Sequence, residues 1–306
     1  YRNDVTREAD VIEEILRIYG YNNIESSKKI NRSLIPYELI SKNDYENRIS
    51  NHLVSLGFVE IMTNSLISPK FNDANHNIKG SLNVSIINSS SADHSSMRNS
   101  MIFSGIEVLS YNINRKQTDL KIFEFGKNYI KKNNKFIEEE KLSIFITGNK
   151  SSKNWNNNLE KSDYYFIKGI VSSIVDSLSL TKLSSMPTKD KNLSEGESLF
   201  INDLILANYG MVNTNILKLV DIEDSVFYAE LNWNNILQSI DTKPILSSEI
   251  GKYPEVSRDL SILINEDVKF ENIHKSAYKA DKGLIKNISL FDVFFGKNIP
   301  KGKKSY

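Results

Sequence analysis

Between residues 98 and 126 the apolar positions change from the period of a helix to the pattern of a buried strand. Four apolar residues are spaced i, i+4, i+7 and i+11, as on one face of a helix; they are Ile102, Ile106, Leu109 and Ile113. Gly105 lies inside this predicted helix, where the missing side chain lets another backbone approach closely. Leu120–Gly126 follows a polar turn and predicts a largely buried strand.

The rest of the chain mixes helical and strand-like segments. Helices are predicted over 44–56, 164–178 and 214–220, and strands over 58–67, 82–87, 142–147, 199–201, 204–211 and 226–231. A charged hairpin is predicted over 131–140. Strands interspersed with helices in no regular β-α order favour an α+β fold built on an antiparallel sheet.

A helix predicted to begin after Thr6 and to stop before Gly20 carries several acidic residues. Three carboxylates at i, i+3 and i+4 share one face, and a fourth lies just upstream; they are Asp10, Glu13, Glu14 and Asp4. Oxygen ligands of this kind suit Mg²⁺. The alternative is a solvated acidic face that Arg7 and Arg17 partly neutralise, and the spacing alone favours this alternative.

A further unit begins near residue 249. A strand over 260–265, a helix over 270–280, a strand over 285–295 and a third strand that begins at 303–306 form the first half of a ferredoxin-like unit. The chain stops before the remaining helix and strand. Several lysines give it a local basic excess suited to phosphates; they are Lys286, Lys297, Lys301, Lys303 and Lys304. Lysines at a turn and an edge strand also discourage edge pairing, and the two interpretations are equally supported.

Composition narrows the compartment and the partners. The chain has 306 residues, a net charge of +1 and no cysteine, so nothing global favours nucleic-acid or membrane binding, and thiolate metal sites are excluded. No apolar run approaches the ~20 residues of a spanning helix, and charges near the N-terminus argue against a signal peptide. We expect a protein of a reducing compartment. Because the chain opens on Tyr1 and closes in mid-pattern, we also expect a fragment.

Three blocks resemble, in order, the β subunit of bacterial phenylalanyl-tRNA synthetase. They are R-N-D-V-T-R-E-A-D-V-I-E-E-I-L-R-I-Y-G-Y-N-N-I at 2–24, R…SGI…N-x-N-R…L-K-I-F-E-F-G at 98–126, and Y-P-x-x-S-R-D-L with L-F-D-V-x-x-G at 253–296. The resemblance implies the end of a small helical domain at 1–24, a linker at 25–37, a class II synthetase-like, non-catalytic domain at 38–248, and a truncated ferredoxin-fold anticodon-binding domain at 249–306.

The family joins phenylalanine to its tRNA with ATP and Mg²⁺, as a cytoplasmic α2β2 tetramer. The resemblance therefore implies the α subunit and tRNA(Phe) as partners and no membrane. In the family, carboxylates matching Asp4, Asp10, Glu13 and Glu14 are assigned to Mg²⁺, shared with the α subunit. The tRNA contacts that the last domain implies would fall on its lysines, Lys297, Lys301, Lys303 and Lys304.

No residue of this chain is predicted to be catalytic, and the aminoacylation site is expected on the α subunit. A class II site needs an Arg-x-Glu strand and an Arg after Gly-x-Gly, because guanidinium groups clamp phosphate oxygens in pairs. Neither motif occurs, and no arginine lies between Arg115 and Arg258. The four histidines stand in no metal-binding spacing. Glu124 is predicted to be a structural, buried partner of Arg98 or Arg115.

Two other interpretations stay open. The chain could be a free-standing, non-enzymatic RNA-binding or assembly protein on a degenerate synthetase core. It could also be an active single-chain amino-acid ligase, which would require that this chain bind ATP alone.

Overall fold

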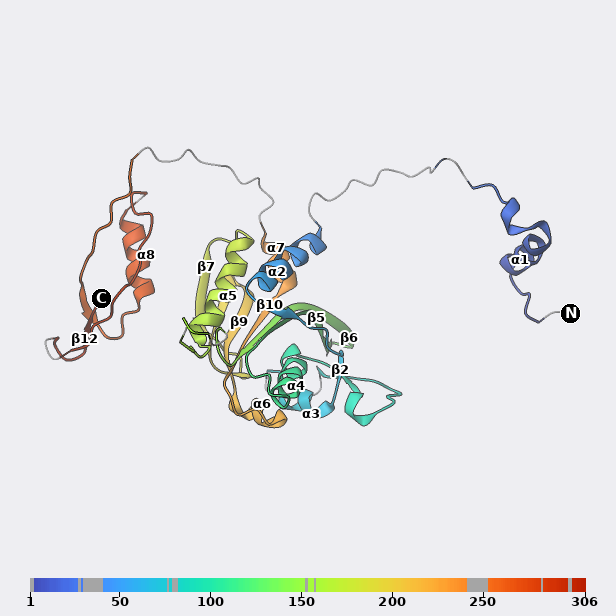
Figure 1. Cartoon of the computed structure of the whole chain (residues 1–306), viewed down its shortest axis with the longest axis horizontal. Coiled ribbons are helices and arrows are strands. Elements are labelled where there is room, and N and C mark those ends of the chain that lie inside the picture. The colour runs from blue at the N-terminus through green and yellow to red at the C-terminus, as the bar shows by residue number, and fades with distance from the viewer. Residues whose placement is uncertain are drawn as a thin grey trace. The chain divides into compact units, whose positions relative to one another are not determined.

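The computed structural model describes residues 3–26, 29, 41–75, 77–78, 82–151, 154–156, 158–240, 253–281, 283–296 and 299–306. The chain divides into two compact units, Tyr1–Thr242 and Lys243–Tyr306 (Figure 1). The predicted linker at 25–37 and the predicted boundary at 248–249 lie largely outside the described residues.

A sheet of seven strands forms the centre of the first unit, in the order β1-β5-β6-β10-β9-β8-β7. The strands are Val59–Glu60 (β1), Leu120–Lys132 (β5), Lys135–Thr147 (β6), Leu183–Pro187 (β7), Leu193–Ile201 (β8), Leu204–Val212 (β9) and Val226–Asn232 (β10). All neighbours run antiparallel except β1 and β5, which are parallel. The predicted α+β fold on a largely antiparallel sheet is confirmed.

The hairpin of β5 and β6 is the longest element of this sheet. Its register runs without a shift from Leu120↔Thr147 to Lys132↔Lys135. Asn133 and Asn134 form the two-residue turn, and both have positive φ (50° and 59°), as the mirror-image hairpin turns require. The predicted strands at 120–126 and 142–147 therefore pair with each other as the base of one long hairpin, whose other end contains the predicted charged segment.

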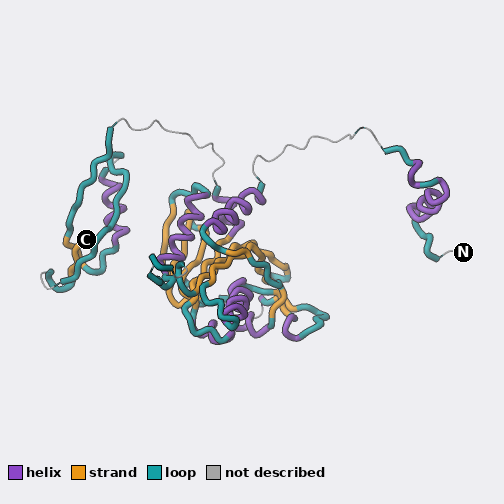
Figure 2. Tube along the Cα trace, viewed as in Figure 1, coloured by secondary structure: helices purple, strands orange, loops and turns teal. Residues whose placement is uncertain are grey.

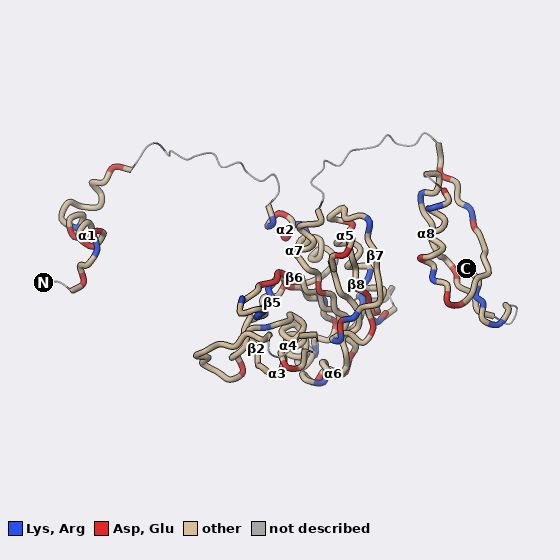
Figure 3. Tube along the Cα trace, turned by 180° about the vertical axis from the view of Figure 1, so that it is seen from behind, with Lys and Arg blue, Asp and Glu red and all other residues tan. Residues whose placement is uncertain are grey.

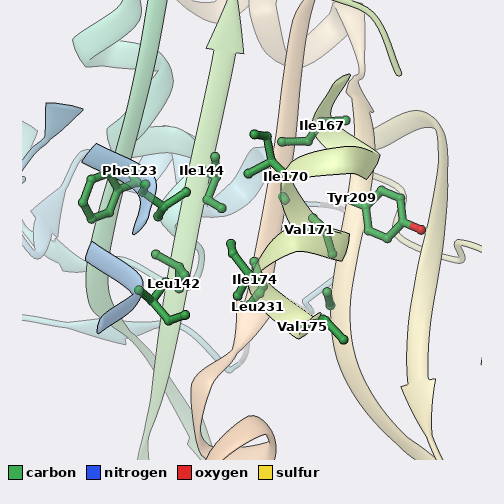
Figure 4. Packing of buried hydrophobic residues seen from close by; sticks show 14 of the residues in the cluster. Phe123, Leu142, Ile144, Ile167, Ile170, Val171, Ile174, Val175, Tyr209 and Leu231 are labelled. Atoms are coloured by element: carbon green, nitrogen blue, oxygen red, sulfur yellow. The ribbon is translucent and has the colours of Figure 1, made fainter. Parts of the chain in front are cut away.

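Three helices cover one face of the sheet, namely α2 (Lys42–Ser55), α5 (Tyr164–Ser177) and α7 (Trp233–Ser239). The amphipathic pattern of α5 explains its place, because its apolar residues recur on one side and are buried against the strands. Figure 4 shows these α5 side chains beside residues of β5, β6, β9 and β10; they are Ile167, Ile170, Val171, Ile174 and Val175.

The other face carries a second apolar cluster under α4 (Met101–Ile113). Around it lie α3 (Pro69–Ala74), α6 (Thr214–Leu217), the 3₁₀ helices η3 (Ala92–His94) and η4 (Lys218–Val220), and a small sheet of β2 (Leu66–Ile67), β4 (Ser96–Met97) and β3 (Val84–Ser85). The close neighbour of Gly105 is the ring of Phe145, whose Cζ lies 2.0 Å from an ideal Cβ on that glycine. We predicted an approach of backbone; the structure instead brings a side chain there.

Some predicted strands are shorter or broken. The strand predicted over 58–67 is broken into β1 and β2, because the chain leaves the large sheet after β1 and Thr63 bonds to Glu124. The predicted strand at 82–87 is only β3, and β4, β7, α3 and α7 were not predicted. These elements are short, so they carry too few residues for a period to be recognised.

The N-terminal segment contains α1 (Glu8–Tyr19) and the 3₁₀ helix η1 (Tyr21–Asn23). The helix begins after the N-cap residue Arg7, one residue later than predicted, and stops at Gly20, whose φ is 92°. All residues of α1 are described and none is buried; Ile15, for example, is 60 % exposed.

The second unit contains β11 (Leu263–Asn265) paired antiparallel with β12 (Lys303–Ser305), and the predicted helix as α8 (Phe270–Ala280) (Figure 2). The strand predicted at 285–295 is reduced, in the described residues, to one bridge between Phe294 and Ser305. Its apolar side chains from Leu290 to Phe295 are exposed, so burial does not stabilise a strand in that part.

Candidate functional site

A row of polar residues crosses the second face of the sheet, where the apolar cover under α4 ends. The strand register places Glu124 opposite Ser143, and Ser143 opposite Glu230. The row continues across the next two strands, with Asn208 opposite Glu230 and Ser198 opposite Asn208. Glu124, Ser143 and Ser198 are buried. A polar surface inside a fold is costly unless each group finds a partner, so its contacts define what the face can do.

Arg98 and Glu124 form a buried ion pair at one end of this row. Arg98 is 2 % and Glu124 3 % exposed, and Nη1 of the arginine lies 3.2 Å from Oε1 of the glutamate. Thr63 joins the pair, since its hydroxyl donates to Oε2 of Glu124 (2.7 Å) and accepts from Nη1 of Arg98 (2.6 Å). Its backbone N–H also donates to Oε1 (3.2 Å). The predicted structural pairing of Glu124 is thus present, with Arg98 as the partner.

The backbone around Arg98 holds this side chain in place. Nε of Arg98 donates to the carbonyl of Lys127 (2.9 Å), and the carbonyl of Arg98 accepts from the N–H of Tyr129 (2.9 Å). An ideal Cβ at Gly126 would lie 2.4 Å from Nη2, so only glycine leaves room for the guanidinium. The arginine is therefore fixed against β5 on three sides.

Glu230 is the centre of a second polar cluster on the same face. Its Oε2 accepts from the hydroxyl of Tyr228 (2.9 Å) and from Nδ2 of Asn128 (3.4 Å). Nζ of Lys141 lies 3.8 Å from Oε1 of Glu230 and 2.9 Å from Oε2 of Glu139. Burial works against the charged ammonium, but the two carboxylates outweigh it and hold the pKa of Lys141 above its usual value. Burial, together with Glu230, raises the pKa of Tyr228.

This arrangement of charged residues stabilises the fold and does not form a binding site for a triphosphate. Nε and Nη1 of Arg98 are already bonded to protein groups, and Lys141 is held between two glutamates. A phosphate would have to displace the buried carboxylate of Glu124 from Arg98, which is unfavourable. At Lys141 it would meet the carboxylates of Glu139 and Glu230. Thr63, Lys141 and Glu230 were not singled out from the sequence. The sequence signal that could have found Glu230 is its position as a charged residue inside the apolar strand Val226–Asn232.

The predicted magnesium carboxylates lie on and before α1. Asp10 pairs with Arg7 (2.9 Å) and accepts the backbone N–H of Arg7 and Thr6, and these bonds lower its pKa. Arg17 lies near Glu13 (3.5 Å) and Glu14 (3.4 Å). Asp4 also has an interaction partner. Over the described part of the chain, no group of three or more acidic or histidine side chains is gathered that could hold a metal ion.

The predicted RNA-binding lysines differ in their surroundings. Lys301 and Lys303 are exposed at the start of β12. Lys304 is 8 % exposed, and its Nζ donates to the carbonyl of Glu266 (2.8 Å) and lies over the ring of Tyr306. Lys297 lies outside the described residues. Of the four, Lys301 and Lys303 are the ones whose described side chains are open to a phosphate.

The sheet order and the helices of the first unit define a class II aminoacyl-tRNA synthetase fold. Two solved structures of pyrrolysyl-tRNA synthetase from Desulfitobacterium hafniense share this fold. One has a TM-score of 0.51 over 64 % of this chain and 67 % of that one, and the other has 0.50 over 65 % and 68 %. Both are 14 % identical to this chain, so they support the fold alone.

Three family models match consecutive parts of the chain. The tRNA synthetase B5 domain matches residues 1–21, the phenylalanyl tRNA synthetase beta chain CLM domain matches 29–233, and the ferredoxin-fold anticodon binding domain matches 251–306. The chain belongs to the phenylalanyl-tRNA synthetase beta chain family.

Curated relatives agree along the whole chain. Phenylalanine–tRNA ligase beta subunits from Bacteroides thetaiotaomicron, Bacteroides fragilis and Fusobacterium nucleatum are 39 %, 38 % and 34 % identical over all of this chain. The chain spans about two fifths of their length, since it covers 39 %, 39 % and 38 % of them. Within the described residues no helix is both long and apolar enough for a bilayer span.

Proposed function

We propose that this chain is a non-catalytic part of a cytoplasmic phenylalanine–tRNA ligase, which attaches phenylalanine to tRNA(Phe) at the expense of ATP. In this proposal the class II-like domain supports a catalytic α subunit in an α2β2 enzyme, and the last unit contributes to tRNA binding. The observation that carries it is the Arg98–Glu124 pair. A synthetase fold whose buried guanidinium is bound to its own carboxylate supports a neighbouring active site better than a reaction of its own.

An exposed apolar strip at the end of α2 and along β1 favours an α-subunit contact there. Val54, Val59 and Met62 are 55 %, 63 % and 96 % exposed. Beside them is a hollow of about 430 Å³, whose lining includes Val59, Ile61 and Val108. Because β1 is an edge strand of the large sheet, this strip ends in unpaired backbone as well as apolar side chains.

Association with a purified α subunit tests the proposal, measured by size-exclusion chromatography with light scattering. We expect the unmodified chain to associate and Met62→Glu to weaken association at least tenfold. Leu204→Glu, which charges a 43 % exposed site on β9, is the matched control. Equal losses in both variants would remove the strip from the proposal. No association by the unmodified chain would overturn the scaffold role.

Calorimetry with ATP tests the single-chain ligase. We expect no heat of binding from this chain alone, because Nε and Nη1 of Arg98 are bonded to protein groups and Lys141 lies between two glutamates. Binding of ATP by the chain in the micromolar range would favour an independent ligase. Recovery as a monomer that binds many RNAs without an α subunit would instead favour the non-enzymatic RNA-binding protein.

The same proposal includes tRNA contacts at Lys301 and Lys303, with Lys297 and Lys304 as its further candidates. Magnesium at Asp4, Asp10, Glu13 and Glu14 is also part of it. In this structure Arg7 pairs with Asp10, and Arg17 lies beside Glu13 and Glu14. These described carboxylates are not gathered into a magnesium site. No step of the proposed reaction is therefore assigned to that ion.

A further inference from the structure

The end of the β5–β6 hairpin extends beyond the strands on either side of it. Pairing of β6 with β10 stops at Lys141, opposite Asn232, and pairing of β5 with β1 stops at Phe123. The N–H of Tyr129 still bonds to the carbonyl of Arg98. Past that point, within the described residues, 130–137 pair only with one another. This segment, the hairpin end, is a two-stranded arm with both edges open.

Lysines are concentrated at the hairpin end in an unfavourable arrangement. Lys132 and Lys135 are direct cross-strand neighbours on either side of the Asn133–Asn134 turn. Like charges in this position repel one another and destabilise a hairpin. Lys131 adds a third positive charge on the other face of the hairpin, where it lies across from Phe136. Figure 3 shows the blue lysine segments of this hairpin.

The neighbouring glutamates do not neutralise these lysines. Glu138 pairs with Lys127 (2.6 Å), Glu139 with Lys141 (2.9 Å), and Glu140 with Lys42. In the described part of the chain no ion pair involves Lys131, Lys132 or Lys135. The acidic residues therefore stabilise the base of the hairpin, and its end keeps an uncompensated positive charge.

An exposed aromatic ring accompanies the charge. Phe136 is 70 % exposed and lies directly across from Lys131, whose Nζ is 5.8 Å from the centre of the ring. Because the Phe136 ring is exposed at the hairpin end, it contributes little hydrophobic burial to the stability of the fold. Positive groups that alternate with an exposed ring are what single-stranded nucleic acid uses, through phosphate contacts and base stacking.

We propose that the hairpin end is an RNA-contact site, in which Lys131, Lys132 and Lys135 contact backbone phosphates and Phe136 stacks on an unpaired base. The proposal adds a contact in the synthetase-like domain to those proposed above for the last unit, and it does not depend on an α subunit. An acidic protein segment would use the lysines but gain less from the ring, so RNA fits the surface better.

The test measures fluorescence anisotropy of a short labelled single-stranded RNA as the full 306-residue chain is titrated in, over a range of salt concentrations. The double variant Lys132→Gln/Lys135→Gln should bind about tenfold more weakly at low salt. Its plot of log affinity against log salt should be shallower by about 1.4, since each single-strand phosphate contact contributes about 0.7. Melting should be unchanged or higher, because repulsion is relieved.

Two further variants separate specific contacts from net charge. Lys189→Gln/Lys218→Gln removes two exposed lysines of the same domain that have no acidic partner in the described structure, and should change the affinity less than twofold. Phe136→Leu should weaken binding at least fivefold without changing the salt slope, because it removes stacking and no charge.

Three results would overturn the proposal. They are no RNA binding at low salt, equal losses in both lysine pairs, and polyglutamate binding that needs Lys132 and Lys135 while RNA binding does not. Association with the α subunit, measured on the same preparations, reports on the proposed function separately. If the unmodified chain does not associate with the α subunit but its RNA binding still depends on the hairpin end, the scaffold role is overturned and the RNA-contact site is not.

Discussion

Glu124→Gln should destabilise the synthetase-like domain strongly, even though the side chain keeps its shape. The substitution leaves the guanidinium of Arg98, which is 2 % exposed, without its countercharge. Removing one partner of a buried ion pair costs about 3–5 kcal/mol. Glutamine can still accept from Thr63 and Arg98, so we expect the lower end, about 3 kcal/mol. For a domain of this size that is a fall in melting temperature of roughly 6–12 °C.

Tryptophan fluorescence during urea unfolding measures this loss in the relevant domain. Both tryptophans of the chain, Trp155 and Trp233, lie in the first unit, and Trp233 is fully buried. Glu138→Gln is the matched control on the same hairpin. Its pair with Lys127 is about half exposed on both sides, so its loss should cost at most about 1 kcal/mol.

A double-mutant cycle completes the assay. Arg98→Met together with Glu124→Gln removes both charges, and the pair should recover more than about 2 kcal/mol relative to the sum of the single variants. The reasoning is refuted if Glu124→Gln melts with the unmodified chain. It is equally refuted if that variant assembles with the α subunit at full stability but abolishes aminoacylation, because the glutamate would then act on substrate.

Substitutions at three other positions test separate parts of the fold. Gly105→Ala puts a Cβ into the Phe145 ring, so despite better helix propensity it should cost about 2 kcal/mol in urea unfolding; a stabilised variant would show that the ring moves away freely. Asp163 caps α5 and pairs with Lys150 (2.8 Å), and this pairing lowers the pKa of Asp163. Its stabilisation is therefore complete above the ordinary pKa of an aspartate and is lost as the pH falls through the lowered pKa. Asp163→Ala should therefore cost about 1 kcal/mol at pH 7 and less at pH 3 in thermal melts, whereas Asp163→Asn keeps the cap; an equal cost at both pH values would contradict the linkage. Lys132→Glu turns a repulsive cross-strand pair into an attractive one and should raise stability by up to about 1 kcal/mol by calorimetry, while a lower melting temperature would mean that the two lysines do not face each other in solution.

Long periodic segments were predictable from the sequence, and short or contact-determined ones were not. The helices α4 and α5 and the strands β9 and β10 have enough apolar repeats to be recognised. The break after β1 depends on Thr63 bonding to Glu124, which is 61 residues away, and no local pattern contains that information. The strand predicted at 285–295 also depends on distant contacts, because its apolar residues from Leu290 to Phe295 are exposed in the described structure.

The candidate site was predictable in part for the same reason. A carboxylate between two phenylalanines in a buried strand must have a partner, so pairing of Glu124 with a nearby arginine followed from the sequence. The choice of Arg98 over Arg115 did not, because it depends on the space above Gly126 and on the carbonyl of Lys127. The Glu230 cluster was missed, since only the register of β6 against β10 brings Lys141 to it.

The buried pair also limits what simple substitutions could restore. For Arg98 to hold a phosphate, its Nη1 would have to leave Glu124, and the freed carboxylate would then lie beside the incoming negative charge. Removing Glu124 is not sufficient, because Glu230 lies two strands away in the same row and holds Lys141. Removing Glu230 would not free Lys141, because Glu139 would stay 2.9 Å from its ammonium, and Tyr228 and Asn128 would lose the carboxylate to which they donate. Each cation on this face is thus tied to a different carboxylate, so no single change produces a triphosphate clamp.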